Sequence, residues 1–199
     1  PICRSITGRG VVKTLNIIKK KFPNLKIKKI SSNTKVFDWN IPSEWNVSDA
    51  YVMDKHGLKI VDFKKNNLHL ISYSEPTNKI ITKKELFKNL HHIKKQPEAI
   101  PYITSYYERR WGFCVSYNQF KKIEKKYSPK DKFKVVVDSS LKKNGHLNYG
   151  ELILPGQSKK EILISTYICH PSMANNELSG IMVSMGLINY FKKKKLSKT

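Results

Sequence analysis

The chain has 199 residues, enough for one substantial core or two small ones. Its formal net charge is +23, and only four of its 38 basic residues are arginine: Arg4, Arg9, Arg109 and Arg110. Lysine lacks the planar fork with which arginine binds phosphates and base edges. The charge therefore indicates a solvated lysine-rich surface first, with nucleic-acid binding as the weaker interpretation.

The lengths of apolar runs and the number of cysteines argue against a membrane protein and against a disulfide-stabilised protein. No apolar run reaches the roughly 18 residues that span a bilayer, which argues against a membrane protein. Cys3, Cys114 and Cys169 are widely spaced and form no CxxC pair, so a disulfide framework is not expected and a reducing cytoplasm fits best. Because the chain starts at Pro1 rather than Met, we expect a piece of a longer or processed protein.

The N-terminal region predicts a helix followed by a strand. Apolar residues recur at helical spacing from Val11 to Phe22, and Pro23 ends the pattern. The sequence "LKIKKI" at 25–30 then reads as a strand.

From Val36 the sequence changes to aromatic residues, short apolar runs and turn signals. "DKHG" at 54–57 separates two apolar runs and predicts a hairpin turn in which Gly57 takes positive φ. "NLHLISY" at 67–73 reads as another strand. The pattern is typical of a small antiparallel β module, to which we assign residues 36–128.

A capping box begins a helix in the same region, because Thr82 precedes Glu85 by three residues and apolar residues continue to Ile93. After a lysine-rich helix, strands are predicted at 132–141, 146–156 and 160–170. The outer two are nearly continuous apolar runs, as strands buried on both faces tend to be. The final helix should bury Leu178, Ile181, Met182, Met185 and Ile188.

These elements predict an α/β fold with an insertion. Residues 1–35 and 129–199 should form one sheet with flanking helices, and residues 36–128 should interrupt it as a small β-rich module of unknown role.

The stretch "YICHPSMANNELSG" at 167–180 carries the clearest chemistry. A histidine at the carboxyl end of a buried strand faces the crevice where open α/β sheets place their sites, and neutral imidazole binds zinc well. Asn176 and Glu177 offer oxygen atoms six and seven residues after His170. The alternative is a structural histidine in an ordinary strand–helix loop.

The same stretch resembles the strand–His–loop–N-D-x-x-S-G–helix block of co-catalytic zinc aminopeptidases and related exopeptidases. Nearly the whole chain resembles a bacterial group of aminopeptidase-like domain proteins, often encoded among polysaccharide-biosynthesis genes. The matching pieces are "PICRSITGRGV", "FDWNIPSEWNVSDAYV", "IVDFKKNNLHLISYSEP", "PYITSYYERRWGFCVS", "GHLNYGELILPG" and "STYICHPSMANNELSG". The resemblance implies a zinc-exopeptidase-like sheet with an inserted β module, and a peptidase second half beyond Thr199.

The resemblance also implies roles. It places His170 on a zinc ligand, Asn176 on the carboxylate that bridges two metals, and Glu177 on the residue after it. Asn176 is neutral and so a poorer bridge, and Ser172 stands where an acid usually orients the histidine. Glu177 is the candidate to take over as a ligand. The general base and the other ligands would lie beyond Thr199, so the 199-residue chain alone should be inactive.

Other residues have two interpretations each. In "YYERRWGF", Tyr107, Arg109, Arg110 and Trp111 either bind substrate, by stacking and by pairing with carboxylates, or form the core and rim of the β module.

Near the N-terminus, Arg4 and Ser5 either lie at the substrate end of the site or belong to a loop that caps the first helix. Cys169, next to His170, is either a thiol nucleophile or a small packed side chain.

Three functions follow, in order of preference. The first is part of a metal-dependent aminopeptidase-like hydrolase that cleaves a peptide or amide bond in a small substrate with one or two zinc ions. The second is a non-catalytic relative that binds a ligand or partner, which Asn176 and Ser172 favour. The third is a lysine-rich nucleic-acid-binding module. Assembly into a homo-oligomer stays open.

Overall fold

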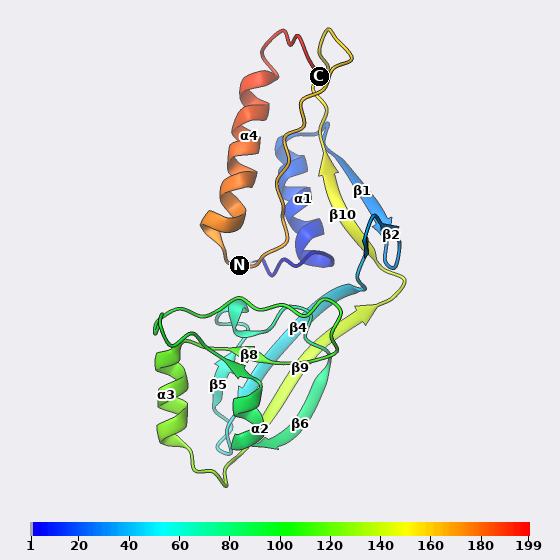
Figure 1. Cartoon of the computed structure of the whole chain (residues 1–199). Coiled ribbons are helices and arrows are strands. Elements are labelled where there is room, and N and C mark those ends of the chain that lie inside the picture. The colour runs from blue at the N-terminus through cyan, green and yellow to red at the C-terminus, as the bar shows by residue number, and fades with distance from the viewer. Residues whose placement is uncertain (1) are drawn as a thin grey trace. The chain divides into compact units, whose positions relative to one another are not determined.

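The computed structural model describes residues 2–199, and the chain divides into two compact units (Figure 1). Unit 1 contains the residues up to Ile41 together with Asn144–Thr199, and unit 2 is Pro42–Lys143. The expected borders were 35/36 and 128/129. The second border differs most, because the strand near residue 132, which we expected in the outer domain, pairs inside unit 2.

Unit 1 holds two helices, a π turn and short strands. Its elements are α1 (Arg9–Lys21), β1 (Lys26–Ser31), β2 (Lys35–Val36), β3 (Trp39–Asn40), β10 (His146–Glu151), the π turn η2 (Ala174–Leu178) and α4 (Ser179–Phe191). β1 pairs antiparallel with β10, with Ser31 opposite His146, so the two outer segments of the chain meet in one sheet. The helix predicted up to Phe22 and the strand predicted at 25–30 are confirmed.

Unit 2 is built on a four-stranded antiparallel sheet in the order β5-β4-β9-β6. Its elements are β4 (Glu44–Met53), β5 (Lys59–Asp62), the 3₁₀ turn η1 (Asn67–His69), β6 (Thr77–Thr82), α2 (Lys83–Lys88), β7 (Leu90–His91), β8 (Phe113–Cys114), α3 (Tyr117–Lys126) and β9 (Lys132–Lys142). Fully buried apolar side chains form its core: Val52, Val61, Leu86, Phe113, Phe133 and Val135.

The central strand β9 buries one face. Phe133, Val135 and Val137 are buried, whereas Lys132 and Lys134 are exposed, which is the period of two expected of a half-buried antiparallel strand. The expectation that this strand is buried on both faces is therefore wrong. The run of three valines hid the alternation, because Val136 is apolar and only partly buried.

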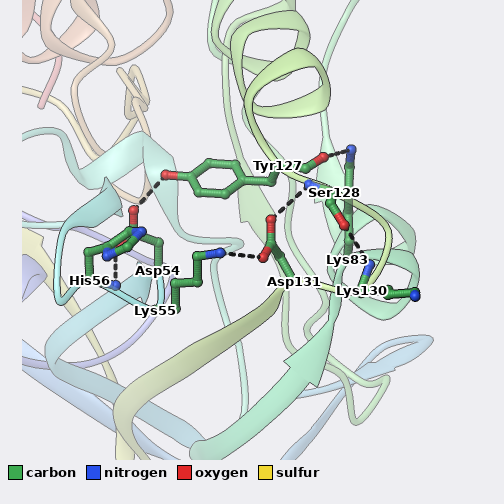
Figure 2. A network of polar contacts seen from close by, with 8 residues as sticks. All are labelled: Asp54, Lys55, His56, Lys83, Tyr127, Ser128, Lys130 and Asp131. Atoms are coloured by element: carbon green, nitrogen blue, oxygen red, sulfur yellow. Dashed lines mark hydrogen bonds and ion pairs between the residues drawn. The ribbon is translucent and has the colours of Figure 1, made fainter.

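The predicted hairpin at 54–57 is present, and Gly57 has φ 81°. The Asp54 carboxylate caps the turn: it accepts the N–H groups of His56 (2.9 Å) and Leu58 (3.0 Å). It also accepts the hydroxyl of Tyr127 at the end of α3, at 2.7 Å (Figure 2). This contact fixes the hairpin turn to the helix.

A second carboxylate strengthens the same connection. Asp131 accepts the backbone N–H of Ser128 at 2.7 Å and pairs with Lys55 of the hairpin turn at 2.9 Å. Lys83, at the start of α2, donates to the carbonyl oxygen of Glu124 in α3. It also donates to the carbonyl oxygen of Tyr127, directly after α3 (Figure 2). Polar contacts thus join the hairpin turn after β4, the start of α2 and the end of α3.

Two predicted elements differ from the structure. Residues 67–73 form no strand, because the Asn66 side chain accepts the N–H of Leu68 at 3.0 Å and draws the chain into the 3₁₀ turn η1. The helix predicted to reach Ile93 ends at Lys88, and Leu90–His91 pairs with β8 instead. The Thr82 cap is confirmed, since its hydroxyl accepts the N–H of Glu85 at 3.2 Å.

The last predicted strand is also changed. Residues 160–170 are extended but form no assigned strand in the part of the chain that the structure describes, and Leu163 is 88% exposed. Ile181 of α4 is buried as expected, whereas Met182 of α4 and Leu178, the last residue of the π turn, are exposed. Of the helices in residues 2–199, none combines the length and the apolar character needed to cross a membrane.

Candidate metal centre

The site lies in unit 1, where the extended segment ends at His170 and the chain turns into α4. Pro171 is buried, and Ser172 reverses the chain with φ 51°. A single π turn follows, in which the N–H of Leu178 donates to the carbonyl of Met173 at 3.3 Å. Such turns add one residue to a helix and are frequent at functional sites. Here the turn accompanies an acidic side chain, Glu177, that is only 1% exposed.

Glu177 and His170 form a close pair. The distance from Nδ1 of His170 to Oε2 of Glu177 is 2.9 Å. A carboxylate only accepts hydrogen bonds, so Nδ1 carries the proton of this contact. The lone pair of a neutral imidazole is then on Nε2, which is the nitrogen with which this tautomer can bind a metal. This is the carboxylate–histidine arrangement that orients metal-binding imidazoles.

Cys169 completes a group of three candidate donors. Ligand atoms of Cys169, His170 and Glu177 all lie within 4.8 Å of one another. Burial raises the pKa of the Cys169 thiol to about 11, and the negative charge of Glu177 adds to the effect. At neutral pH the side chain is therefore a thiol and a poor nucleophile, which argues against the nucleophile interpretation.

The second oxygen of Glu177 is available. Oε1 is buried and accepts no hydrogen bond from the part of the chain that the structure describes. A buried carboxylate oxygen without a donor is costly, because it has lost its hydration. A cation beside it would remove that cost.

Arg4 supports the site from the N-terminal segment. It is buried, and its Nε donates to the carbonyl oxygen of His170 at 3.0 Å. Ser5 donates to the carbonyl of Thr7 at 2.6 Å and does not cap the helix, because the N-cap of α1 is Gly8. Of the two residues predicted near the substrate end, Arg4 therefore contacts the His170 backbone and Ser5 stabilises its own loop.

Two glycines allow the close approach of these segments. A Cβ on Gly10 would lie 1.9 Å from the carbonyl oxygen of Cys3, so only glycine lets α1 pack against the residues that precede it. A Cβ on Gly180 would lie 2.2 Å from Oγ1 of Thr166, which brings the start of α4 against the extended segment.

Not all predicted ligands are brought together. His170 and Glu177 meet, whereas Asn176 is exposed on the π turn, and no hydrogen bond joins it to either residue in the described part of the chain. The turn explains the difference, because neighbouring residues of a helical turn point in different directions. Ser172 is exposed.

The other predicted binding residues belong to unit 2. Trp111 is buried against Phe113, with Lys79 over its ring at 4.9 Å, so it is part of the module core. Arg110 donates to the carbonyl of Thr104 at 3.1 Å and lies 3.7 Å from Glu108. Tyr107 and Arg109 are exposed.

The sequence interpretation missed two features of the centre. The sequence indicates Cys169 as a nucleophile or a packing residue and not as a metal donor, although it stands next to the candidate ligand His170. The contact of Arg4 with His170 joins residues 166 positions apart, and no local pattern in the sequence indicates it.

The comparisons with known proteins agree with the resemblance drawn from the sequence. A family model described as "Domain of unknown function (DUF4910)" matches residues 1–199. A relative from Clostridium acetobutylicum, named "Putative polysaccharide biosynthesis protein with aminopeptidase-like domain", is 51% identical over 181 residues. That match covers 91% of this chain and 40% of the relative.

A solved structure shows the same fold. The crystal structure of a "putative peptidase" from Clostridium acetobutylicum matches with a TM-score of 0.93 and 47% identity, over 100% of this chain and 45% of that one. The chain thus spans less than half the length of either relative. The similarity to aminopeptidase-like proteins is confirmed, and the mixed helix and strand architecture is consistent with an α/β class.

Proposed function

Because this chain belongs to the DUF4910 family and is similar to peptidase-like proteins, we propose that it supplies part of the metal centre of a hydrolase that cleaves a peptide or amide bond. The single observation that carries the proposal is the buried Glu177 carboxylate, which binds Nδ1 of His170 and keeps a second oxygen without a donor. We also propose that unit 1 forms part of a zinc-exopeptidase-like sheet, which the longer protein would complete.

The donor set fits zinc. Zinc prefers imidazole nitrogen, thiolate sulfur and carboxylate oxygen, and a catalytic site keeps three protein ligands and one open position. His170 would bind through Nε2, with Glu177 as its orienting acid or as a second ligand, and Cys169 is the third candidate donor. Zinc bound there would polarise a substrate carbonyl and lower the pKa of a bound water.

The chain's own residues do the positioning. Glu177 accepts the hydrogen bond from Nδ1–H of His170 and so fixes the tautomer of the imidazole. Arg4 holds the backbone of His170 in place from a buried position. We propose that the general base and the remaining ligands come from the part of the longer protein that this chain does not cover, since the chain covers 40% of its relative.

One ion fits the residues better than two. The resemblance places Asn176 where a bridging carboxylate would stand, and a neutral, exposed amide attracts a second cation weakly. The same observation favours the second candidate, a peptidase-like relative that binds a ligand without cleaving it.

The first test is metal content. The protein purified at its native length should hold one equivalent of zinc by elemental analysis, and His170→Ala should abolish it. Glu177→Gln keeps the shape but loses the charge that orients the imidazole, and should weaken zinc binding by about 10–100-fold. His56→Ala, in an exposed turn of unit 2, is the matched control and should keep the full equivalent.

The second test is hydrolysis of aminoacyl amides with zinc, cobalt or manganese added. Activity that requires the metal and disappears in His170→Ala supports the hydrolase. A protein that holds no metal and cleaves no such amide, while remaining folded by circular dichroism, would leave the non-catalytic relative as the better explanation.

A further inference from the structure

Thr199 meets the beginning of the extended segment through two backbone hydrogen bonds. The N–H of Thr199 donates to the carbonyl of Lys160 at 3.0 Å, and the N–H of Ile162 donates to the carbonyl of Thr199 at 2.8 Å. One residue that bonds in this way to the two neighbours of another forms the repeat unit of a parallel β ladder. Thr199 and Glu161 are therefore paired as neighbours in a parallel sheet.

The rest of the extended segment has no such pairing. In the part of the chain that the structure describes, no backbone–backbone hydrogen bond joins Leu163–Cys169 to another segment. Most of its side chains are apolar, apart from Ser165 and Thr166, and most are exposed, with Leu163 the most open at 88%. An extended apolar run of this kind is typical of a parallel strand covered on both faces.

The helix after this segment is also uncovered. No residue of Ser179–Phe191 is charged, yet Ile181 is its one buried side chain among the described residues. A helix that is apolar all round is normally buried. A cavity of about 660 Å³ opens between α1, α4 and the extended segment; its lining includes Leu15, Ile18, Ile162, Ile168, Met185 and Ile188.

We propose that the residues that follow Thr199 in the longer protein continue as a β-strand parallel to Ile162–Ile168. The two strands and α4 then form a β–α–β unit, the usual way to connect parallel neighbours. Two observations favour these residues as the partner of the extended segment. The hydrogen bonds at Thr199 already set the direction and register of the new strand. The relatives are also much longer than this chain, which covers 40% and 45% of their length. The inference is independent of any metal at His170.

The register makes the proposal specific. Backbone groups of a strand point to alternate edges, so every second residue faces the same neighbour. Lys160 and Ile162 face Thr199, and therefore Ile164, Thr166 and Ile168 should bond to the new strand. Leu163 should lie opposite the second residue after Thr199.

Residue-resolved amide hydrogen exchange tests this pairing in two proteins, the 199-residue chain and the protein of native length. The amides of Ile164, Thr166 and Ile168 should exchange rapidly in the short chain and slow by about 100-fold or more in the long one, as for amides released only by larger openings. A proton–proton contact in the NMR spectrum should join Leu163 to the second residue after Thr199. Amides of β10 serve as the internal reference.

A pair of substitutions gives a second measurement. Leu163→Lys and Ile80→Lys both replace exposed side chains, 88% and 69% exposed, in units 1 and 2. Neither should change the Tm of the 199-residue chain. In the protein of native length, Leu163→Lys should lower the Tm by several degrees and Ile80→Lys should not.

Two results would overturn the proposal. The first is equally fast exchange of Ile164, Thr166 and Ile168 in both proteins. The second is a native protein that ends at Thr199 and protects these amides only when it dimerises, since the occupant would then be a second copy of the chain.

Discussion

Asp54 is the side chain on which the contact between the hairpin turn and α3 depends. Burial alone would raise the pKa of Asp54, but the hydrogen bond from Tyr127 and the N–H groups of Leu58 and His56 lower it below its ordinary value. The ionised carboxylate is thus the form that the folded unit prefers.

Tyr127→Phe removes one of these donors and keeps the ring that packs on Phe133. The free energy of unfolding should fall by about 1–3 kcal/mol, because a buried charged acceptor loses a partner. Urea denaturation measures the change. Tyr51→Phe, on a half-buried strand residue of the same unit, is the matched control and should change stability little; equal effects of the two substitutions would refute the role given to the Tyr127 hydroxyl.

His69 gives unit 2 a dependence on pH. Burial lowers the pKa of His69 below its ordinary value of 6.5, although its Nδ1–H donates to the carbonyl of Cys114 at 2.7 Å and partly offsets the effect. As the pH falls through 6.5, His69 therefore binds a proton in the unfolded chain but stays neutral in the folded chain. The free energy of unfolding is therefore unaffected by His69 above this pH. It decreases as the pH falls further, until the lower pKa of His69 in the folded chain is passed.

Urea midpoints between pH 8 and 5, spanning the roughly 6.5 expected of free histidine, test this dependence. His69→Gln keeps a donor for the Cys114 carbonyl and cannot titrate, so its stability should fall less on acidification. Part of the decrease of the urea midpoint with falling pH should remain in this variant, because burial also lowers the pKa of His91. The exposed His56→Gln should behave like the unsubstituted protein, and a His69→Gln curve parallel to it would contradict the assignment.

At the scale of elements, close packing of α1 against the N-terminal segment positions Arg4. Gly10→Ala would place a methyl group 1.9 Å from the carbonyl oxygen of Cys3, so a backbone segment must move. We expect a loss of about 1–3 kcal/mol, as for other overpacked sites. The Arg4 contact with His170 should loosen, and zinc affinity in the native-length protein should decrease.

Gly186→Ala is the control for this substitution. It also adds a methyl group to a glycine inside a helix of unit 1, but nothing lies within 4 Å of the new atom. Helix propensity should then stabilise the protein by up to about 1 kcal/mol. Thermal unfolding should therefore give a lower Tm for Gly10→Ala and an equal or higher Tm for Gly186→Ala.

Local signals in the sequence identified elements whose own residues determine them. The stripe of α1, the Thr82 cap and the positive φ of Gly57 need no distant partner, and each is confirmed. The 3₁₀ turn η1 was missed because one side chain, Asn66, outweighs an apolar run. Strand pairing failed where the partner lies far away in the chain, as at 160–170.

The candidate centre follows the same division. The spacing from His170 to Glu177 is local, and the sequence proposed both as metal ligands. Which of two adjacent side chains, Asn176 or Glu177, turns inward depends on the π turn, and the sequence predicts no such turn. The support from Arg4 depends on tertiary contact alone.

For the whole molecule, the net charge of +23 predicts how nucleic acids interact with it. Binding should rest on lysine–phosphate contacts, so the logarithm of the association constant should fall linearly and steeply with the logarithm of salt concentration. Fluorescence anisotropy with unrelated oligonucleotides should give similar affinities. Tight, sequence-selective binding at physiological salt would instead support the nucleic-acid module.

The domain borders show the limit of composition as a guide. The change of residue types near Val36 precedes the true start of unit 2 by six residues, because β2 and β3 still belong to unit 1. At the other end, the apolar strand β9 looks in sequence like part of a buried sheet, and only its pairing with β4 and β6 assigns it to unit 2.

The pairing of β4 with β9 places the two ends of unit 2 together, since Glu44 lies opposite Lys142. The ends left in unit 1 are also neighbours, because Asn33 bonds to Ile41 and Ser32 bonds to Gly145. Residues 42–143 are thus a cassette with adjacent ends, the arrangement that tolerates gain or loss of a whole domain in a single genetic event. A gene with a short turn in place of that cassette could still encode unit 1, so evolution can change the two units separately.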